Sequence, residues 1–189
     1  MRMTQARTNL LRAMLLLLVC GVAVADEPPQ AGWTPREFRF TYQGFTAKYS
    51  CDGLSDRIKA VLLLLGARKQ DLSVAPTGCT EGFGRATLFP GVAVKMYVLA
   101  PLDDKSPPDT APVATAWRNV DIPRREALAA AGDCELTEQI KQTILPLFTT
   151  RNVEYKSTCV PHQLTPGGTR LRADVLVSAA PTSAPAAAR

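Results

Sequence analysis

The chain has 189 residues, of which 46% are hydrophobic and 21% charged, and its formal net charge is +5. A chain of this length can form one domain or two small lobes that share a core. Three of its basic residues, Arg2, Arg7 and Arg12, lie in a segment that we expect to be removed. The remainder has 19 basic and 17 acidic residues and a net charge of +2. This small excess argues against a nucleic-acid partner.

Residues 1–25 have the pattern of a secretory signal peptide. The three arginines precede an apolar stretch from Ala13 to Val24, and a small-x-small cleavage signature ends at Ala25. The apolar stretch is shorter than the roughly 20 residues that span a bilayer, and no later segment is long and apolar enough. A lipoprotein signal at Cys20 is the weaker alternative, because Val19 stands where a small residue is required. We therefore predict a periplasmic or secreted protein that is cleaved after Ala25.

The mature chain is expected to open with a tether over residues 26–35, which are rich in proline and polar residues. An extended segment follows, in which Phe38, Phe40 and Tyr42 alternate onto one face, and it continues past a bulge or turn at Gly44. We expect this face to be buried in the core. If the segment is an unpaired edge, the same face could bind a partner strand.

A helix is predicted over residues 54–66, where apolar residues recur with helical spacing. Asp52 or Ser55 can cap its first turn. Gly66 can end it, because glycine adopts the left-handed conformation that closes many helices.

Further strands are predicted over 71–78, 92–99, 113–120, 151–158 and 170–177. Pro76 argues that the first of these is an edge strand. Two of the strands carry an apolar face with a period of two residues: Val94, Met96 and Val98 in one, and Leu171, Ala173, Val175 and Val177 in the other. Trp33 and Trp117 are expected to pack in the core or at an edge. Residues 101–112 are expected to be a linker, and the Ala/Pro-rich tail 178–189 to be disordered.

A second helix is predicted over residues 136–148, again from apolar residues at helical spacing. Thr137 or Asp133 can cap it. Pro146 lies inside the pattern and is expected to kink or shorten the helix, because proline lacks the backbone N–H and its ring collides with the preceding turn.

The two halves of the chain resemble each other. Residues 54–59 (L-S-D-R-I-K) align without gaps on residues 136–141 (L-T-E-Q-I-K), and each helix is followed by a strand that ends near a cysteine. We therefore predict one α+β domain over 36–177, made of two β-α-β-β pseudo-repeats, 36–100 and 113–177. Two helices packed on a mostly antiparallel sheet, in a variant of the ferredoxin-like arrangement, is the expected topology.

Four cysteines remain after cleavage, namely Cys51, Cys79, Cys134 and Cys159. An even count in an exported chain indicates disulfides. A helix of this length advances about 20 Å and the following strand returns about 25 Å, so Cys79 should end near Cys51 and Cys159 near Cys134. The pairing of Cys51 with Cys134 and of Cys79 with Cys159 also respects the repeat and is the competing alternative. The spacing favours neither a redox C-x-x-C site nor zinc, and no cofactor or metal is expected.

The function that the sequence favours is that of a noncatalytic binding or structural protein of a bacterial cell envelope, with an unidentified protein or envelope partner. A narrower hypothesis is an inhibitor of an envelope hydrolase that inserts the loop 80–91 or 160–169. The alternative from another class is a small hydrolase that uses His162 as its base, with Asp133 or Glu135 nearby. No catalytic motif supports the alternative, and His162 is interpreted as an exposed loop residue.

The signal peptide makes the first testable prediction. Expression of the full chain in a bacterial host should give a mature protein whose N-terminal residue is Asp26, as measured by intact mass and N-terminal sequencing. Ala25→Leu should block this cleavage and leave the precursor. A mature N-terminus at a lipid-modified Cys20 would contradict the prediction.

Overall fold

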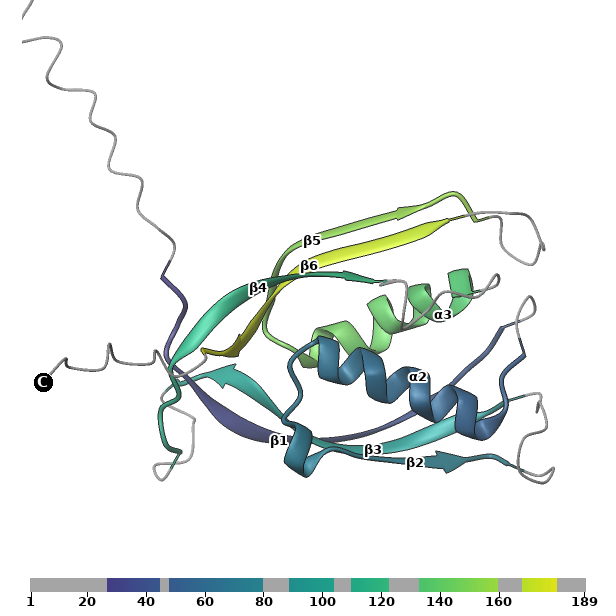
Figure 1. Ribbon diagram of the computed structural model, residues 1–189, viewed down its shortest axis with the longest axis horizontal. Coiled ribbons are helices and arrows are strands. Elements are labelled where there is room, and N and C mark those ends of the chain that lie inside the picture. The colour runs from purple at the N-terminus through teal and green to yellow at the C-terminus, as the bar shows by residue number, and fades with distance from the viewer. Residues whose placement is uncertain are drawn as a thin grey trace, which may run out of the picture.

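The structure, a computed structural model, describes residues 27–44, 48–79, 89–103, 110–122, 133–159 and 168–179. The described residues form six strands and two helices, and each half of the chain has the order strand, helix, strand, strand (Figure 1). The elements are β1 (Ala31–Thr41), α2 (Cys51–Leu64), the 3-10 helix η2 (Lys69–Asp71), β2 (Ser73–Thr77), β3 (Gly91–Pro101), β4 (Thr115–Ile122), α3 (Asp133–Gln139) with its continuations η3 (Ile140–Ile144) and η4 (Leu145–Leu147), β5 (Thr150–Ser157) and β6 (Thr169–Ser178).

The strands lie in two sheets, and the two helices lie between them (Figure 1). One sheet has the strand order β1-β3-β2 and the other β4-β6-β5, and all neighbouring strands are antiparallel. The α+β class is therefore confirmed. The single sheet expected from the sequence is not observed, because each three-stranded sheet covers its own helix with its own apolar face. Between the described parts of the two sheets only one isolated bridge forms, from Ala31 to Val113.

One hydrophobic core fills the space between the two sheets. The expected apolar face of β3 is buried, as are Leu171, Ala173 and Val175 of β6. Phe40 of β1 and Tyr42, which directly follows the strand, are also buried, and Phe38 packs against the same core, as the expected alternation of these residues predicts. Both helices contribute to this core, so each half of the chain buries its apolar surface partly against the other half.

Helix α2 begins one turn earlier than predicted and ends where predicted. Ser50, rather than Asp52 or Ser55, is the N-cap, and its Oγ accepts a hydrogen bond from the Gly53 N–H at 3.1 Å. At the other end Gly66 adopts φ +97°, and the N–H of Ala67 donates to Leu62 O, as in a Schellman motif. The glycine is required there because a side chain is strained at that φ.

The second helix is irregular, as Pro146 predicts. Helix α3 passes into the π-helical turn η3 and then into the 3-10 turn η4, which contains Pro146. The N–H of Leu145 donates to Ile140 O, five residues earlier, which is the π-helical pattern. This shift keeps Ile140, Ile144 and Leu145 buried while the chain accommodates a residue that has no N–H.

Strand β1 begins inside the stretch that was interpreted as a tether. Its pairing with β3 starts at Ala31 opposite Pro101, so Trp33 lies in a strand rather than in a flexible segment. Proline and polar residues suggested a tether, but both are tolerated in a strand at the edge of a sheet, so the composition did not reveal the strand. Strand β1 ends at Thr41, and no strand passes Gly44 within the described residues. A Cβ atom at Gly44 would overlap the hydroxyl of Tyr42.

Both disulfides form as predicted, Cys51 with Cys79 and Cys134 with Cys159, with Cα–Cα distances of 6.1 and 6.2 Å. The competing pairing across the two halves is therefore wrong. Each disulfide joins the start of a helix to the end of the strand that follows it, because the strand runs antiparallel to the helix.

Two polar contacts tie the end of β1 to the second helix. The hydroxyl of Tyr42 donates to Glu135 Oε2 at 3.2 Å. The side-chain amide of Gln139 accepts from the N–H of Gln43 at 3.1 Å and donates to its carbonyl at 2.7 Å. The Gln139 side chain thus pairs with the backbone of Gln43 as a neighbouring strand would, which joins the two halves outside the apolar core.

The disulfides make the second prediction. The double variant Cys51→Ala, Cys79→Ala should lose about 3 kcal/mol of unfolding free energy, because the bridge closes a loop of 28 residues. The variant Cys134→Ala, Cys159→Ala should lose a similar amount, since its cysteines are 25 residues apart. Urea unfolding with and without a thiol reductant measures both. An unfolding midpoint that reductant leaves unchanged in the wild-type protein would contradict the prediction.

Candidate functional site

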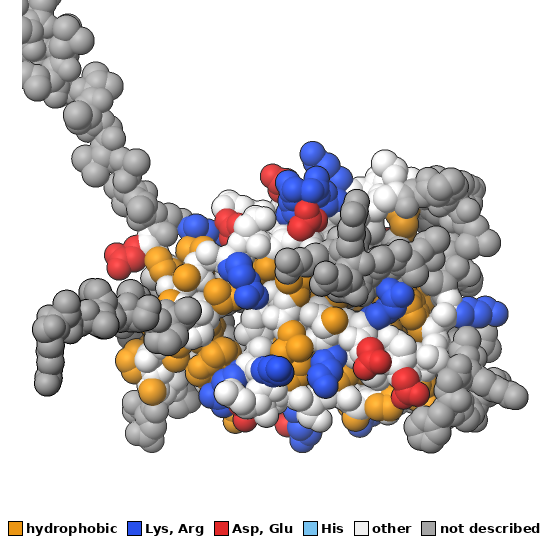
Figure 2. All heavy atoms as spheres, viewed as in Figure 1, with side chains coloured by type: hydrophobic (Ala, Val, Ile, Leu, Met, Phe, Trp, Pro, Cys, Tyr) orange, Lys and Arg blue, Asp and Glu red, His pale blue; other side chains and the backbone are white. Residues whose placement is uncertain are grey.

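The outer face of the sheet β4-β6-β5 carries most of the polar contacts that join separate strands in the described chain. Strand alternation directs Val120, Ile122, Leu171, Ala173 and Val175 into the core. The alternate residues point outward and form what we call the polar face: Trp117, Asn119, Asp121, Arg151, Glu154, Lys156, Arg170, Arg172 and Asp174. Figure 2 shows basic and acidic side chains gathered over β5 and β6, at the top of that view.

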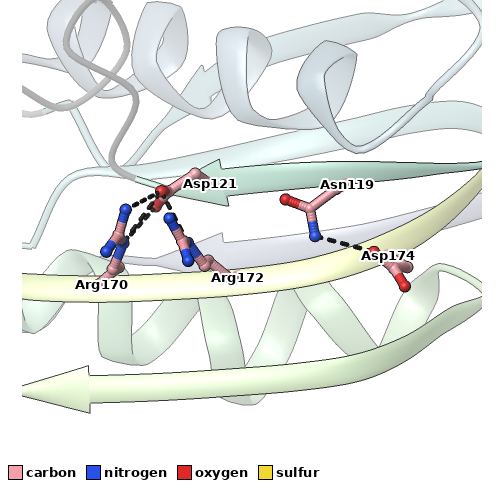
Figure 3. Close-up of polar contacts among 5 residues, drawn as sticks. All are labelled: Asn119, Asp121, Arg170, Arg172 and Asp174. Atoms are coloured by element: carbon pink, nitrogen blue, oxygen red, sulfur yellow. Dashed lines mark hydrogen bonds and ion pairs between the residues drawn. The ribbon is translucent and has the colours of Figure 1, made fainter.

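Asp121 of β4 is shared by two arginines of β6 (Figure 3). Its Oδ2 accepts from Nε and Nη2 of Arg170 at 3.0 and 2.8 Å, and from Nε of Arg172 at 3.0 Å. The hydrogen bond from Arg170 is the main reason that the pKa of Asp121 is lowered, and the bond and charge of Arg172 add to it. The carboxylate is therefore ionised at neutral pH, and one negative charge faces two positive ones.

Asp174 of β6 is the centre of a second cluster. It accepts a hydrogen bond from the side-chain amide of Asn119 at 2.9 Å and another from Asn152 at 2.8 Å. Arg151 Nε lies 3.6 Å from its Oδ2. The bonds from Asn119 and Asn152 are the main reason that the pKa of Asp174 is lowered. Both carboxylates of the clusters thus serve as fixed anions that position their neighbours, and neither is suited to donate a proton at neutral pH.

A tryptophan covered by an arginine occurs at the corresponding place in each half of the chain. The guanidinium of Arg151 lies 4.3 Å from the ring centre of Trp117, and that of Arg68 lies 5.3 Å from the ring centre of Trp33. Arg68 also lies 4.6 Å from the ring centre of Tyr97, so it is held between two aromatic rings. Such contacts are favourable because the face of an aromatic ring is electronegative.

Both tryptophans belong to a small second core where the two sheets meet. Trp33 is paired across the sheet with Leu99, and Trp117 is paired with Leu176. Both leucines are buried, and they pack with Ala31 and with partly buried neighbours that include the two tryptophan rings. The expectation that Trp33 and Trp117 are packing residues agrees with this arrangement.

The structure does not test the residues proposed for catalysis. His162 and most of the loops 80–91 and 160–169 lie outside the described residues, as do residues 1–25, so the hydrolase, inhibitor and signal-peptide hypotheses remain predictions. Glu135 accepts the bond from Tyr42. In the part of the chain that the structure describes, no group of His, Cys, Asp and Glu residues could hold a metal ion, and no helix is long and apolar enough to cross a membrane.

The polar face was not anticipated from the sequence. Asp121 and its partner Arg170 are 49 residues apart, and Asn119 and Asp174 are 55 residues apart. The alternation of R-L-R-A-D over residues 170–174 could have indicated a strand with one charged face, but not which carboxylate its arginines would meet.

Comparison with known proteins gives no match: no family model, no curated protein and no solved structure resembles this chain. The polar face must therefore be interpreted from its own geometry.

The lowered pKa values make the third prediction. Because the carboxyl of Asp121 has a lower pKa in the folded than in the unfolded chain, its contribution to stability is present above the ordinary aspartate pKa of about 3.9 and is lost as the pH falls through the folded pKa. Urea unfolding of Asp121→Asn and of wild type should therefore differ at pH 6 and converge towards pH 2. Asp56→Asn, which removes an exposed charge from α2, is the control. A difference that is constant over this pH range would contradict the prediction.

Proposed function

We propose that this chain is an exported, noncatalytic binding protein of a bacterial cell envelope, and that it contacts its partner through the polar face. The observation that carries the proposal is the fixed arrangement of charge on that face: Asp121 and Asp174 hold the guanidinium groups of Arg170, Arg172 and Arg151 in place. Charged groups held by their neighbours lose little conformational freedom when a partner arrives, which favours specific association.

Two features support export. The pattern of residues 1–25 favours a secretory signal, and disulfides such as Cys51–Cys79 and Cys134–Cys159 persist in oxidising compartments. The bridges also brace the two helices, which suits a protein that has to hold a binding surface outside the cytoplasm.

We also propose that the two halves are copies of one β-α-β-β unit. The equivalent sheet orders β1-β3-β2 and β4-β6-β5 support this, as do the two disulfides. The strongest support is the repeated tryptophan: Trp33 with Leu99 and Arg68 in one half, and Trp117 with Leu176 and Arg151 in the other. Superposition of residues 31–101 on residues 115–178 in an experimental structure tests the duplication, and helices that pack on opposite faces of their sheets would exclude it.

Site-directed photo-crosslinking tests the proposed binding surface and is the fourth prediction. The mature protein with p-benzoylphenylalanine in place of Glu154, an exposed residue of the polar face, should form a discrete adduct with a protein of an envelope extract. The same substitution at Glu37, which is exposed on β1 of the other sheet, is the control and should not form it.

The double variant Arg170→Ala, Arg172→Ala should reduce the adduct at position 154, because it removes the positive groups that Asp121 positions. Identical adducts at positions 154 and 37, or no adduct at 154 in extracts prepared at several salt concentrations, would contradict the proposal.

A further inference from the structure

The register of the sheet shows which backbone groups of β4 point away from it. The N–H of Ala179 donates to Ala114 O at 2.8 Å, so these two residues form a hydrogen-bonded pair of the antiparallel ladder. Hydrogen-bonded pairs recur at every second residue, and the pairing of β4 with β6 continues without a bulge. The backbone groups of Trp117, Asn119 and Asp121 therefore point to the free edge, and no hydrogen bond within the described residues satisfies them.

The other three sheet edges among the described strands are blocked. Hydrogen-bonded pairs alternate in the same way between β3 and its neighbours β1 and β2. The backbone nitrogens of Pro35 in β1 and Pro76 in β2 therefore point to the free edges, where each proline removes a hydrogen-bond donor. Strand β5 is interrupted by a bulge between Arg151 and Glu154, in which Asn152 has φ +51°. Prolines and bulges are the means by which sheet edges avoid pairing with other strands.

Strand β4 has no proline and no bulge, and its polar side chains are held by other groups. The side chain of Asn119 is bonded to Asp174, and that of Asp121 to Arg170 and Arg172 (Figure 3). Arg118, the remaining charged residue of the strand, donates to the carbonyl of Leu64 at the end of α2 at 2.6 Å. None of these side chains is left to compete for the backbone of its own strand.

We propose that the free edge of β4 binds an extended, acidic segment of a partner protein, which adds to the sheet β4-β6-β5 as a further antiparallel or parallel strand. The inference rests on the proposed function, since it names how the polar face would engage its partner. Backbone hydrogen bonds to Trp117, Asn119 and Asp121 supply the affinity in this mode of recognition, and side chains beside the edge supply the specificity.

The charge of the sheet determines the chemistry of the partner. Its three strands carry five basic and three acidic residues, a net charge of +2. Arg118 lies on the edge strand itself, and the cluster around Asp121 has one positive charge in excess. A partner strand with carboxylates is therefore favoured over one with amines.

The test uses a blocked peptide of about seven residues in which valine alternates with glutamate, long enough to cover the free edge at about 3.3 Å per residue. A second peptide carries lysine in place of glutamate. Titration of the mature protein, followed through the backbone amide resonances, should shift those of Trp117, Asn119 and Asp121 with the glutamate peptide. The lysine peptide should bind at least about tenfold more weakly, and the difference should shrink as salt is added.

Asn119→Pro is the decisive variant and provides the fifth prediction. The backbone N–H of Asn119 points away from β6, so proline at this position removes the central hydrogen-bond donor of the free edge. The proline ring would also occupy the place of the partner strand. Binding of the glutamate peptide should fall more than about tenfold. Asn119→Ala loses the same side chain but keeps the N–H, and should retain binding. If Asn119→Pro does not fold, the amide shifts of the wild-type protein still decide.

Three outcomes would overturn the inference. The first is that the glutamate peptide shifts amides of other strands, or none. The second is that Asn119→Pro and Asn119→Ala bind equally well. The third is that the free edge is occupied by a second copy of the chain, seen as a dimer in sedimentation that Asn119→Pro dissociates. If the adduct at position 154 still forms when Asn119 is replaced by proline, the proposed function is supported and binding at the free edge is excluded. If no adduct forms at position 154 while Asn119 is intact, both proposals are excluded.

Discussion

The structure depends on one constraint: each three-stranded sheet has an apolar face that has to be kept from water. Over most of their length the sheets do not pack directly on each other, because the two helices lie between them and cover the inner face of each sheet. On the opposite face of the sheet β4-β6-β5, polar residues predominate beyond the contact of Trp117 with Leu176. The polar face forms because strand alternation directs the neighbours of Val120 and Val175 outward.

The same constraint explains why the two ends of the molecule are reinforced differently. At the end where the sheets meet, Trp33, Trp117 and their arginines close a second small core. At the helix starts, the disulfides join each helix to the strand that follows it. Between these ends β4 pairs on one side only, and its side chains are held by β6 and α2. A strand with one free side is thus a consequence of how the halves pack, and it provides the edge at which we propose that another chain is added.

The sequence predicted the features that depend on local chemistry or chain reach. The disulfide pairing followed from the lengths of a helix and the next strand, and Gly66 and Pro146 marked where the helices end or change. The sequence did not predict the features that depend on contacts between residues distant from each other in the chain. Nothing local distinguishes one six-stranded sheet from two sheets of three, since alternation gives the buried face of a strand but not its neighbour. Two other features were missed for the same reason: the start of β1 at Ala31 and the contact of Asp121 with Arg170. Each depends on how a strand aligns with a partner strand that is distant in the sequence.

Hydrogen exchange of the backbone amides in the unliganded protein tests the central claim most directly, which is that β4 is a continuous strand with one free edge. The amides of Arg118, Val120 and Ile122 donate to β6 in the inferred register and should exchange slowly. Those of Trp117, Asn119 and Asp121 should exchange much faster. Slow exchange along all of β4 would show that the edge is already covered, and the opposite alternation would show that the register, and with it the proposed binding edge, is wrong.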